Sequence, residues 1–279
     1  MMDRRPQIGF SQRIRLEWLE QTAYLLLAGN EAPVIPAFLQ DLLRDQLSKG
    51  GTAIRGNREK AVTVLMRTWV RVEPELICFR DAGFDLLRML PPDQHIAVHW
   101  GMTMAAYPFF GVVAENVGKL LRLQENVAAA QVQRRIQEGY GERETVSRAT
   151  RRVLRTFVDW GVLRETFVPG VYGHGKILPI MDHRLAAWLV EAVLRMRPDA
   201  LYPLRAAFRS PHLFPFRLER LPLDALARSE RMELIRHGLD DDLLVLRKLR
   251  NSSSTASDVG RGENPRPCLP APSRPSGEP

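Results

Sequence analysis

Apolar residues recur at helical spacing in four segments at the start of the chain. These segments cover residues 13–28, 36–48, 58–72 and 75–90. In the first segment, Leu16, Leu19 and Ala23 lie three or four positions apart, which puts them on one face of a helix. Turn signals rich in glycine or proline separate the segments. The pattern predicts an α-helical N-terminal unit over residues 7–107.

A different pattern begins at residue 108. Apolar stripes over residues 109–121 and 129–138 predict two helices, with a break between them near Glu125. The stretch Gly139-Tyr140-Gly141 predicts a turn, because both glycines tolerate a positive φ. A third helix is expected from about Thr145 to Trp160, where Gly161 is a natural stop signal.

This third predicted helix separates apolar from basic residues. At 100° per residue one face carries the apolar side chains Val146, Ala149, Val153, Phe157 and Trp160. The opposite face carries Arg148, Arg151, Arg152 and Arg155. The sequence places few compensating acidic residues beside them, so a positively charged surface is expected.

The period changes after Gly161. Residues 162–168 alternate like a strand, residues 169–176 are a glycine-rich loop, and residues 177–180 are expected to return as a second strand. Pro179 restricts that second strand to a sheet edge. The pattern predicts a β-hairpin with Tyr172, His174 and Lys176 at its tip, followed by a helix over residues 183–196.

Three helices followed by a hairpin resemble the winged helix-turn-helix superfamily over about residues 110–196, within a domain at 108–198. The resemblance implies that the third helix lies in a DNA major groove and that the wing contacts backbone or minor groove. Arginine suits this role, because its forked guanidinium pairs with phosphate or with guanine. The expected DNA-binding residues are Ser147, Arg148, Arg151, Arg152, Arg155, Tyr172, His174 and Lys176.

The whole chain has a second resemblance. A helical unit leads through Met89-Leu90-Pro91-Pro92 into the winged helix, which is similar to the accessory nucleic-acid-binding proteins of BREX-type phage-defence loci. That resemblance implies a regulator or an accessory subunit of a DNA-processing or phage-defence assembly. The segment after residue 199 departs from the compact pattern of those proteins.

The C-terminal region has a weaker pattern. Residues 199–250 predict a mixed α/β extension, with a short edge strand at 213–218 and helices at 222–237 and 240–249. Residues 251–279 are rich in serine, proline and glycine, which predicts a disordered tail. The expected fold class is therefore mainly α, with a helical N-terminal unit followed by a winged helix-turn-helix.

Charge narrows the class of partner. The net charge is +8, which favours an acidic partner such as nucleic acid, an anionic membrane or an acidic protein. The chain lacks a signal-peptide pattern and an apolar run long enough to span a bilayer, so a cytoplasmic protein without a membrane partner is expected. Double-stranded DNA is the expected partner; an RNA binder and a protein–protein adaptor are the alternatives.

Enzyme motifs fail at decisive positions. Residues 170–176 match the phosphate-loop spacing, but Ile177 stands where a magnesium-binding Ser or Thr is needed, and Pro179 blocks the following helix. His95 and His99 have helical spacing, but Ile96 replaces the glutamate that a zinc protease requires. We therefore expect a non-enzymatic protein with no catalytic residues, no metal site and no cofactor.

Overall fold

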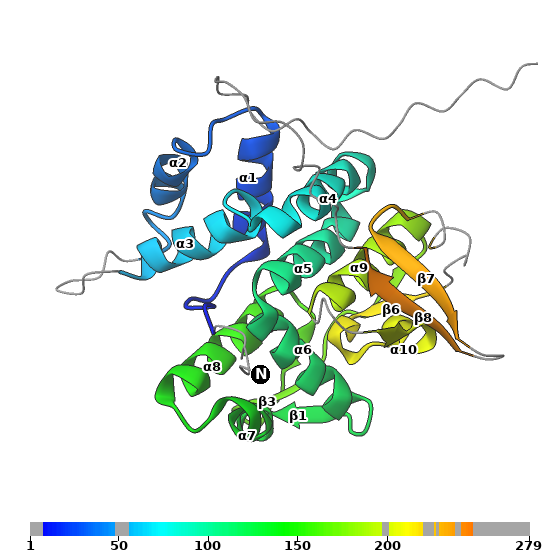
Figure 1. Ribbon diagram of the computed structural model, residues 1–279. Helices are drawn as coiled ribbons and strands as arrows, with labels where there is room; N and C mark the ends of the chain where they lie inside the picture. The colour runs from blue at the N-terminus through cyan, green and yellow to red at the C-terminus, as the bar shows by residue number, and fades with distance from the viewer. Residues whose placement is uncertain are drawn as a thin grey trace, which may run out of the picture.

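The computed structural model describes residues 8–47, 56–196, 201–219, 226, 229–237 and 241–247. The expected tail at 251–279 lies outside these residues. Within them the protein is mainly helical, with small sheets beside the helices (Figure 1).

The N-terminal part confirms the four predicted helices. They are α1 (Leu16–Leu27), α2 (Ile35–Leu42), α3 (Asn57–Trp69) and α4 (Ile77–Met89), with the short 3-10 turn η1 (Pro74–Leu76) before α4. The apolar stripe of α1 is buried at Leu19 and Ala23. Its inward face therefore packs as the spacing predicts.

The next helix, α5 (His95–Ala106), follows the 3-10 turn η2 (Pro92–Gln94) and is buried at all twelve of its residues. It runs through the middle of the molecule in Figure 1. The larger of two buried clusters extends from Phe10 to Phe216. The boundary expected between residues 107 and 108 is therefore not a gap in the core.

Three helices and three strands follow α5. They are α6 (Pro108–Leu121), β1 (Asn126–Ala128), α7 (Ala129–Tyr140), α8 (Glu144–Asp159), β2 (Leu163–Glu165) and β3 (Val171–His174). The strands form one antiparallel sheet in the order β1-β3-β2. Val127 pairs with Tyr172, and Arg164 pairs with Gly173. The region where the sequence predicts only a break between two helices is thus the strand β1.

Aromatic rings fasten this part to α5. The ring of Trp100 stacks on Phe157 of α8 at a centroid distance of 4.9 Å and meets Phe110 of α6 edge-on at 5.0 Å. Trp160, Phe214 and Phe216 complete the group, which we name the Trp100 cluster. It joins α5, α6 and α8 to the C-terminal part.

The hairpin differs from the predicted one in its second strand. Residues 171–174 pair with β2, whereas β4 (Leu178–Ile180) pairs in parallel with β6 (Phe216–Leu218). The reason is close backbone contact: a Cβ at Gly175 would lie 2.1 Å from the carbonyl oxygen of Gly161. Glycine is needed there because the chain passes directly over the end of α8. The prediction that residues 177–180 form the returning strand of the hairpin is wrong.

The turn before α8 is also shorter than predicted. Of the two glycines in this turn, Gly141 alone has a positive φ, of 83°, and it ends α7. Gly139 lies inside α7. The expected role of both glycines holds for Gly141 alone.

The C-terminal part begins with α9 (His183–Arg195). Asp182 caps this helix by accepting hydrogen bonds from the backbone N–H groups of Arg184 and Leu185, at 2.8 and 3.0 Å. Such a cap satisfies donors that have no partner within the helix. The remaining elements are β5 (Tyr202–Pro203), α10 (Leu204–Phe208), η3 (Pro211–Leu213), β6, β7 (Met232–His237) and β8 (Asp241–Leu246).

The prediction of helices at 222–237 and 240–249 is wrong over residues 232–237 and 241–246. These residues form an antiparallel pair of strands, and β8 also pairs with β5. Met232 and Leu244 are buried beside Val190 and Leu194 of α9. Alternate residues of the strands therefore cover one face of α9, which requires the two-residue period of a strand.

The helices of the described residues are short relative to a bilayer. No single helix among them is long and apolar enough to cross a membrane. Residues 92–106 and 108–121 are together long and apolar enough to span a bilayer, but the chain bends by 117° between the two helices.

Two glycines provide a matched test of the α5–α9 contact. A Cβ at Gly101 would lie 2.3 Å from Cζ3 of Trp188, whose ring is fixed by stacking on Phe79. Gly101→Ala should lower the free energy of unfolding by about 1–3 kcal/mol, because the packed ring has no room to move. Gly139→Ala, with open space around it in α7, should instead raise it by roughly 0.5–1 kcal/mol. Urea unfolding measures both, and equal stability of the wild type and Gly101→Ala would contradict this packing.

Candidate nucleic-acid interface

Helix α8 has the two faces that its sequence predicts. Val146, Ala149, Val153 and Phe157 are buried. The side chains of Arg148, Arg151 and Arg155 are 63, 57 and 49% exposed. The basic face of α8, which we define as Arg148, Arg151, Arg152 and Arg155, therefore points away from the core.

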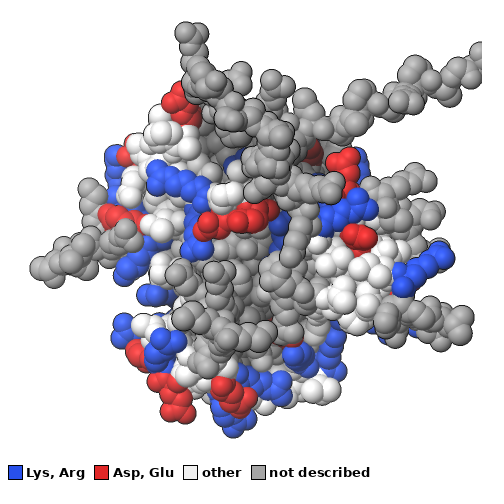
Figure 2. Space-filling model, in the orientation of Figure 1, with Lys and Arg blue, Asp and Glu red and all other residues white. Residues whose placement is uncertain are grey.

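Carboxylates accompany this basic face. Glu144 Oε1 lies 2.9 Å from Nε of Arg148 and 3.1 Å from Nη2 of Arg151. Arg155 forms an ion pair with Glu165 of β2. The expectation of few compensating acids is wrong, and Figure 2 shows acidic side chains among basic ones at the lower left, where α8 lies in Figure 1. Both carboxylates are 60% exposed, so their ion pairs contribute little to stability.

Arg152 differs from the other three arginines. It is half-buried, and no carboxylate among the described residues pairs with it. Burial, and then the positive charges of Arg148 and Arg151, lower the pKa of Arg152. A phosphate placed here relieves that repulsion, because it neutralises several guanidinium groups at once.

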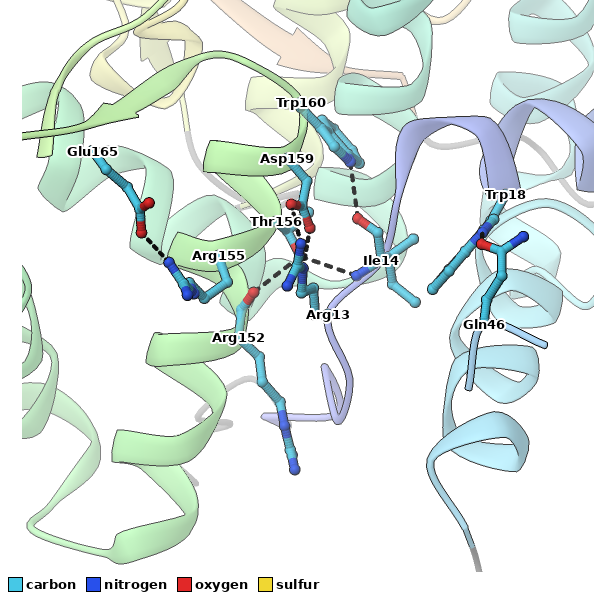
Figure 3. A network of polar contacts seen from close by, with 10 residues as sticks. All are labelled: Arg13, Ile14, Trp18, Gln46, Arg152, Arg155, Thr156, Asp159, Trp160 and Glu165. Atoms are coloured by element: carbon cyan, nitrogen blue, oxygen red, sulfur yellow. Dashed lines mark hydrogen bonds and ion pairs between the residues drawn. The ribbon is translucent and has the colours of Figure 1, made fainter. Parts of the chain in front are cut away.

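The N-terminal segment holds α8 from the side (Figure 3). The backbone N–H of Ile14 donates to Thr156 Oγ1 at 3.1 Å, and Nε1 of Trp160 donates to the carbonyl oxygen of Ile14 at 3.0 Å. Arg13 forms an ion pair with Asp159. These contacts fix the C-terminal half of α8, while Figure 3 shows the Arg152 side chain directed away from the pair of Arg155 and Glu165.

Of the other predicted site residues, Ser147 lies on α8 as expected, whereas the three residues predicted for the hairpin tip lie elsewhere. Ser147 is half-buried, and its Oγ accepts a hydrogen bond from Gln137 of α7 at 3.1 Å. Tyr172 is only 7% exposed in the central strand of the sheet. His174 Nε2 lies 3.3 Å from the carbonyl oxygen of Leu121, at the base of the hairpin. Lys176 is exposed, but its backbone N–H donates to Gly161 at the end of α8. Placing Tyr172, His174 and Lys176 at the hairpin tip is therefore wrong.

The actual tip of the hairpin is residues 166–170, and it is apolar. The side chain of Phe167 is fully exposed, and Val168 is 59% exposed. Thr166 orders the tip: its Oγ1 lies 3.0 Å from the carbonyl oxygen of Val171 and accepts the N–H of Val168 at 3.2 Å. The sequence shows Phe167 within an alternating strand pattern, which gives no sign that it lies outside the core.

Three exposed arginines of this region are not among the site residues predicted from the sequence. Arg134 and Arg135 are exposed on α7, and Arg164 is exposed on β2. Arg164 Nε donates to the carbonyl oxygen of His174 at 3.1 Å, which aligns its side chain along the sheet. The signal for the α7 pair was present, since two adjacent arginines stand between the inward-facing Val132 and Ile136.

The two histidines with helical spacing form a buried network with Glu20 of α1. His95 Nδ1 and His99 Nε2 lie 2.6 and 2.5 Å from the two oxygens of Glu20. Nε1 of Trp69 donates to Nδ1 of His99, so the Nε2 proton of His99 points at Glu20. Two ligands of a tetrahedral zinc ion at about 2.0–2.1 Å are roughly 3.4 Å apart. The shorter separations are those of direct hydrogen bonds, and this network fastens α1 to α5.

A metal site is not formed within the described part of the chain, where no three His, Cys, Asp or Glu side chains are grouped to hold an ion. One serine–histidine contact resembles a catalytic pair: Ser210 Oγ lies 2.8 Å from Nδ1 of His212. However, the N–H groups of residues 209, 210, 213 and 214 all donate to nearby carbonyl oxygens. They leave no pair of local donors for an oxyanion. The contact therefore suits the cap of η3, whose N-cap is Ser210.

Comparisons of the chain with protein-family models, curated proteins and solved structures found no match.

The Glu20 network generates a prediction about acid stability. Burial favours a raised pKa for Glu20, but the hydrogen bonds and charges of His99 and His95 outweigh it and lower the pKa to about 2. A carboxyl group with a lowered pKa stabilises the fold above its unfolded pKa, and this contribution is lost as the pH falls through its folded pKa. Glu20 should contribute a loss of unfolding free energy between pH 4.5 and about 2. The buried His99, whose pKa is lowered mainly by desolvation, adds a loss that begins at higher pH. Glu20→Gln should be less stable than the wild type at neutral pH and show a flatter acid profile. Parallel profiles in urea unfolding would count against the network.

Proposed function

We propose that residues 108–198 form a winged helix-turn-helix that binds double-stranded DNA, with α8 as the recognition helix and β2–β3 as the wing. The order of elements supports this proposal, since α6, α7 and α8 precede the antiparallel hairpin of β2 and β3. Pairing of β1 with β3 adds a third strand that joins the hairpin to the helices.

The observation that carries the proposal is the outward basic face of an anchored helix. Arg148, Arg151 and Arg155 have only exposed carboxylate partners, and such pairs are weak in water. DNA phosphates can replace these carboxylates, and binding then gains from the release of condensed counterions. Arg152 contributes a guanidinium without a carboxylate partner among the described residues.

The proposed mechanism has three contacts. Helix α8 enters the major groove, where its arginines pair with phosphates or with guanine O6 and N7. Arg134 and Arg135 on α7 and Arg164 on β2 meet the flanking backbone. Phe167 at the hairpin tip touches the adjacent minor groove with its apolar ring.

In the cell the protein acts, in this proposal, as a cytoplasmic, non-enzymatic regulator or as an accessory subunit of a DNA-processing or phage-defence assembly. The phage-defence role rests on the resemblance noted in the sequence. It needs no cofactor, because capture of DNA by α8 is electrostatic.

An adaptor that binds another protein is the second candidate, and exposed apolar side chains on α2 favour it. Phe38 and Leu42 of this helix are 48 and 39% exposed, and its N-cap residue Val34 is 47% exposed. Phe38→Glu should leave DNA affinity unchanged under the DNA-binding proposal. The adaptor becomes the better account if the protein binds neither DNA nor RNA, and if Phe38→Glu abolishes capture of a partner that withstands high salt.

Removal of the basic face tests its role in DNA binding. A variant with Arg148, Arg151, Arg152 and Arg155 changed to Ala should bind a labelled random DNA duplex roughly 100-fold more weakly or worse, because each arginine contact contributes measurably. Fluorescence anisotropy at fixed salt measures the dissociation constant, and an RNA duplex of equal length tests the RNA alternative. The matched control changes four exposed arginines outside α8, namely Arg44, Arg88, Arg184 and Arg205, to Ala. Equal losses in the two variants would show that net charge alone matters, and would remove α8 from the proposal.

Removal of the carboxylates that compete with DNA phosphates for these arginines tests the same interface. Glu144→Gln combined with Glu165→Gln should strengthen DNA binding several-fold, since it takes two negative charges from the interface and releases three arginines. The same anisotropy assay measures the change, and thermal unfolding confirms that the variant is folded. A weaker affinity in a folded variant contradicts the idea that these arginines face DNA.

A further inference from the structure

A hollow of about 540 Å³ lies between α6, β3, Ile177 and the segment from α10 to β6. Its size falls within the range of small-molecule sites. Ile177, which is 51% exposed, and the half-buried Phe208 supply apolar wall, and Arg122, Arg209 and Arg217 are its exposed arginines. The hollow therefore combines apolar side chains with exposed cationic groups.

These three arginines have no carboxylate partner among the described residues. Arg122 instead donates from Nη2 to the backbone carbonyl oxygen of Arg209, which holds its guanidinium at the rim. Glu115, on the same helix as Arg122, pairs with Lys119 at 2.8 Å and has its other oxygen 3.8 Å from Nε2 of His212. The positive charge at the mouth is therefore available to an anion from solution.

The walls of the hollow are preformed. A Cβ at Gly118 would lie 2.2 Å from the carbonyl oxygen of Pro211, so α6 and η3 are in direct backbone contact. Nε1 of Trp100 donates to the carbonyl oxygen of His212 at 3.0 Å. Phe214 and Phe216 both meet Trp100 edge-on. A ligand entering here loses little affinity to reorganisation of the protein, because the walls are already ordered.

We propose that this hollow binds a small organic anion. The carboxylate or phosphate of the ligand meets Arg122, Arg209 and Arg217, and its apolar body covers Ile177 and Phe208. This site goes beyond DNA binding and does not depend on it. Its wall includes His174, the last residue of β3, so the occupied site touches the strand that supports the hairpin.

The test uses the full chain and the fluorescent aromatic sulfonate 8-anilinonaphthalene-1-sulfonate as the probe. The wild type should bind it saturably, and Arg122→Ala combined with Arg217→Ala should weaken binding at least about tenfold, because two charge-assisted hydrogen bonds to the sulfonate are removed. Arg88→Ala combined with Arg184→Ala removes the same charge from α4 and α9 and should leave the affinity unchanged. Partial unfolding raises the fluorescence of this probe, so a loss of signal is not explained by a damaged fold.

Three outcomes overturn the proposal. The wild type fails to bind the probe saturably, or the control variant loses as much affinity as the rim variant. In the third, duplex DNA displaces the probe from the protein lacking the basic face of α8, which means that the rim arginines hold nucleic-acid phosphate. Saturable binding with an intact DNA affinity in the rim variant supports the site independently of the DNA proposal.

Discussion

The arrangement of aromatic rings around Trp100 is the interaction on which the rest of the structure depends. Trp100 is fully buried in α5 and contacts rings that come from α6, α8 and the segment leading into β6. Aromatic pairs of this kind stabilise beyond the area they bury, and their edge-on geometry restricts how the elements cross. Because Phe157 and Trp160 are directed into this cluster, the arginines of α8 are left on the solvent side.

The same packing bears on the proposed function. The buried face of α8 packs against the Trp100 cluster. The backbone of Ile14 forms hydrogen bonds with both Thr156 and Trp160. A charged surface on a rigid helix loses less conformational entropy on binding than one on a loop. Under the proposed function, the basic face is thus in place before DNA binds, and only its weak ion pairs with Glu144 and Glu165 must be exchanged.

Sequence alone predicted the elements that have one buried face, because a stripe of apolar residues is visible in α1, α3 and α8. It did not single out α5, since a helix buried on every side has no stripe. The sequence predicts the wrong returning strand for the hairpin, because residues 171–174 and 177–180 are both compatible with a strand. Which of them pairs with β2 depends on the close contact between Gly175 and the carbonyl oxygen of Gly161. The strands β7 and β8 are stabilised by packing against α9, which lies far from them in the sequence. The carboxylate partner of Arg155 likewise comes from another element, β2. Such tertiary partners cannot be inferred from local pattern.

The salt dependence of DNA binding tests the central claim most directly. If about six cations of the protein contact phosphates, the logarithm of the binding constant should fall with the logarithm of salt concentration with a slope of about −5. Replacing the four arginines of the basic face with Ala should make this slope shallower by about 3 to 4, because each arginine removed from a phosphate lowers the number of counterions released. An unchanged slope in a folded variant would show that α8 does not face the DNA backbone and would contradict the account.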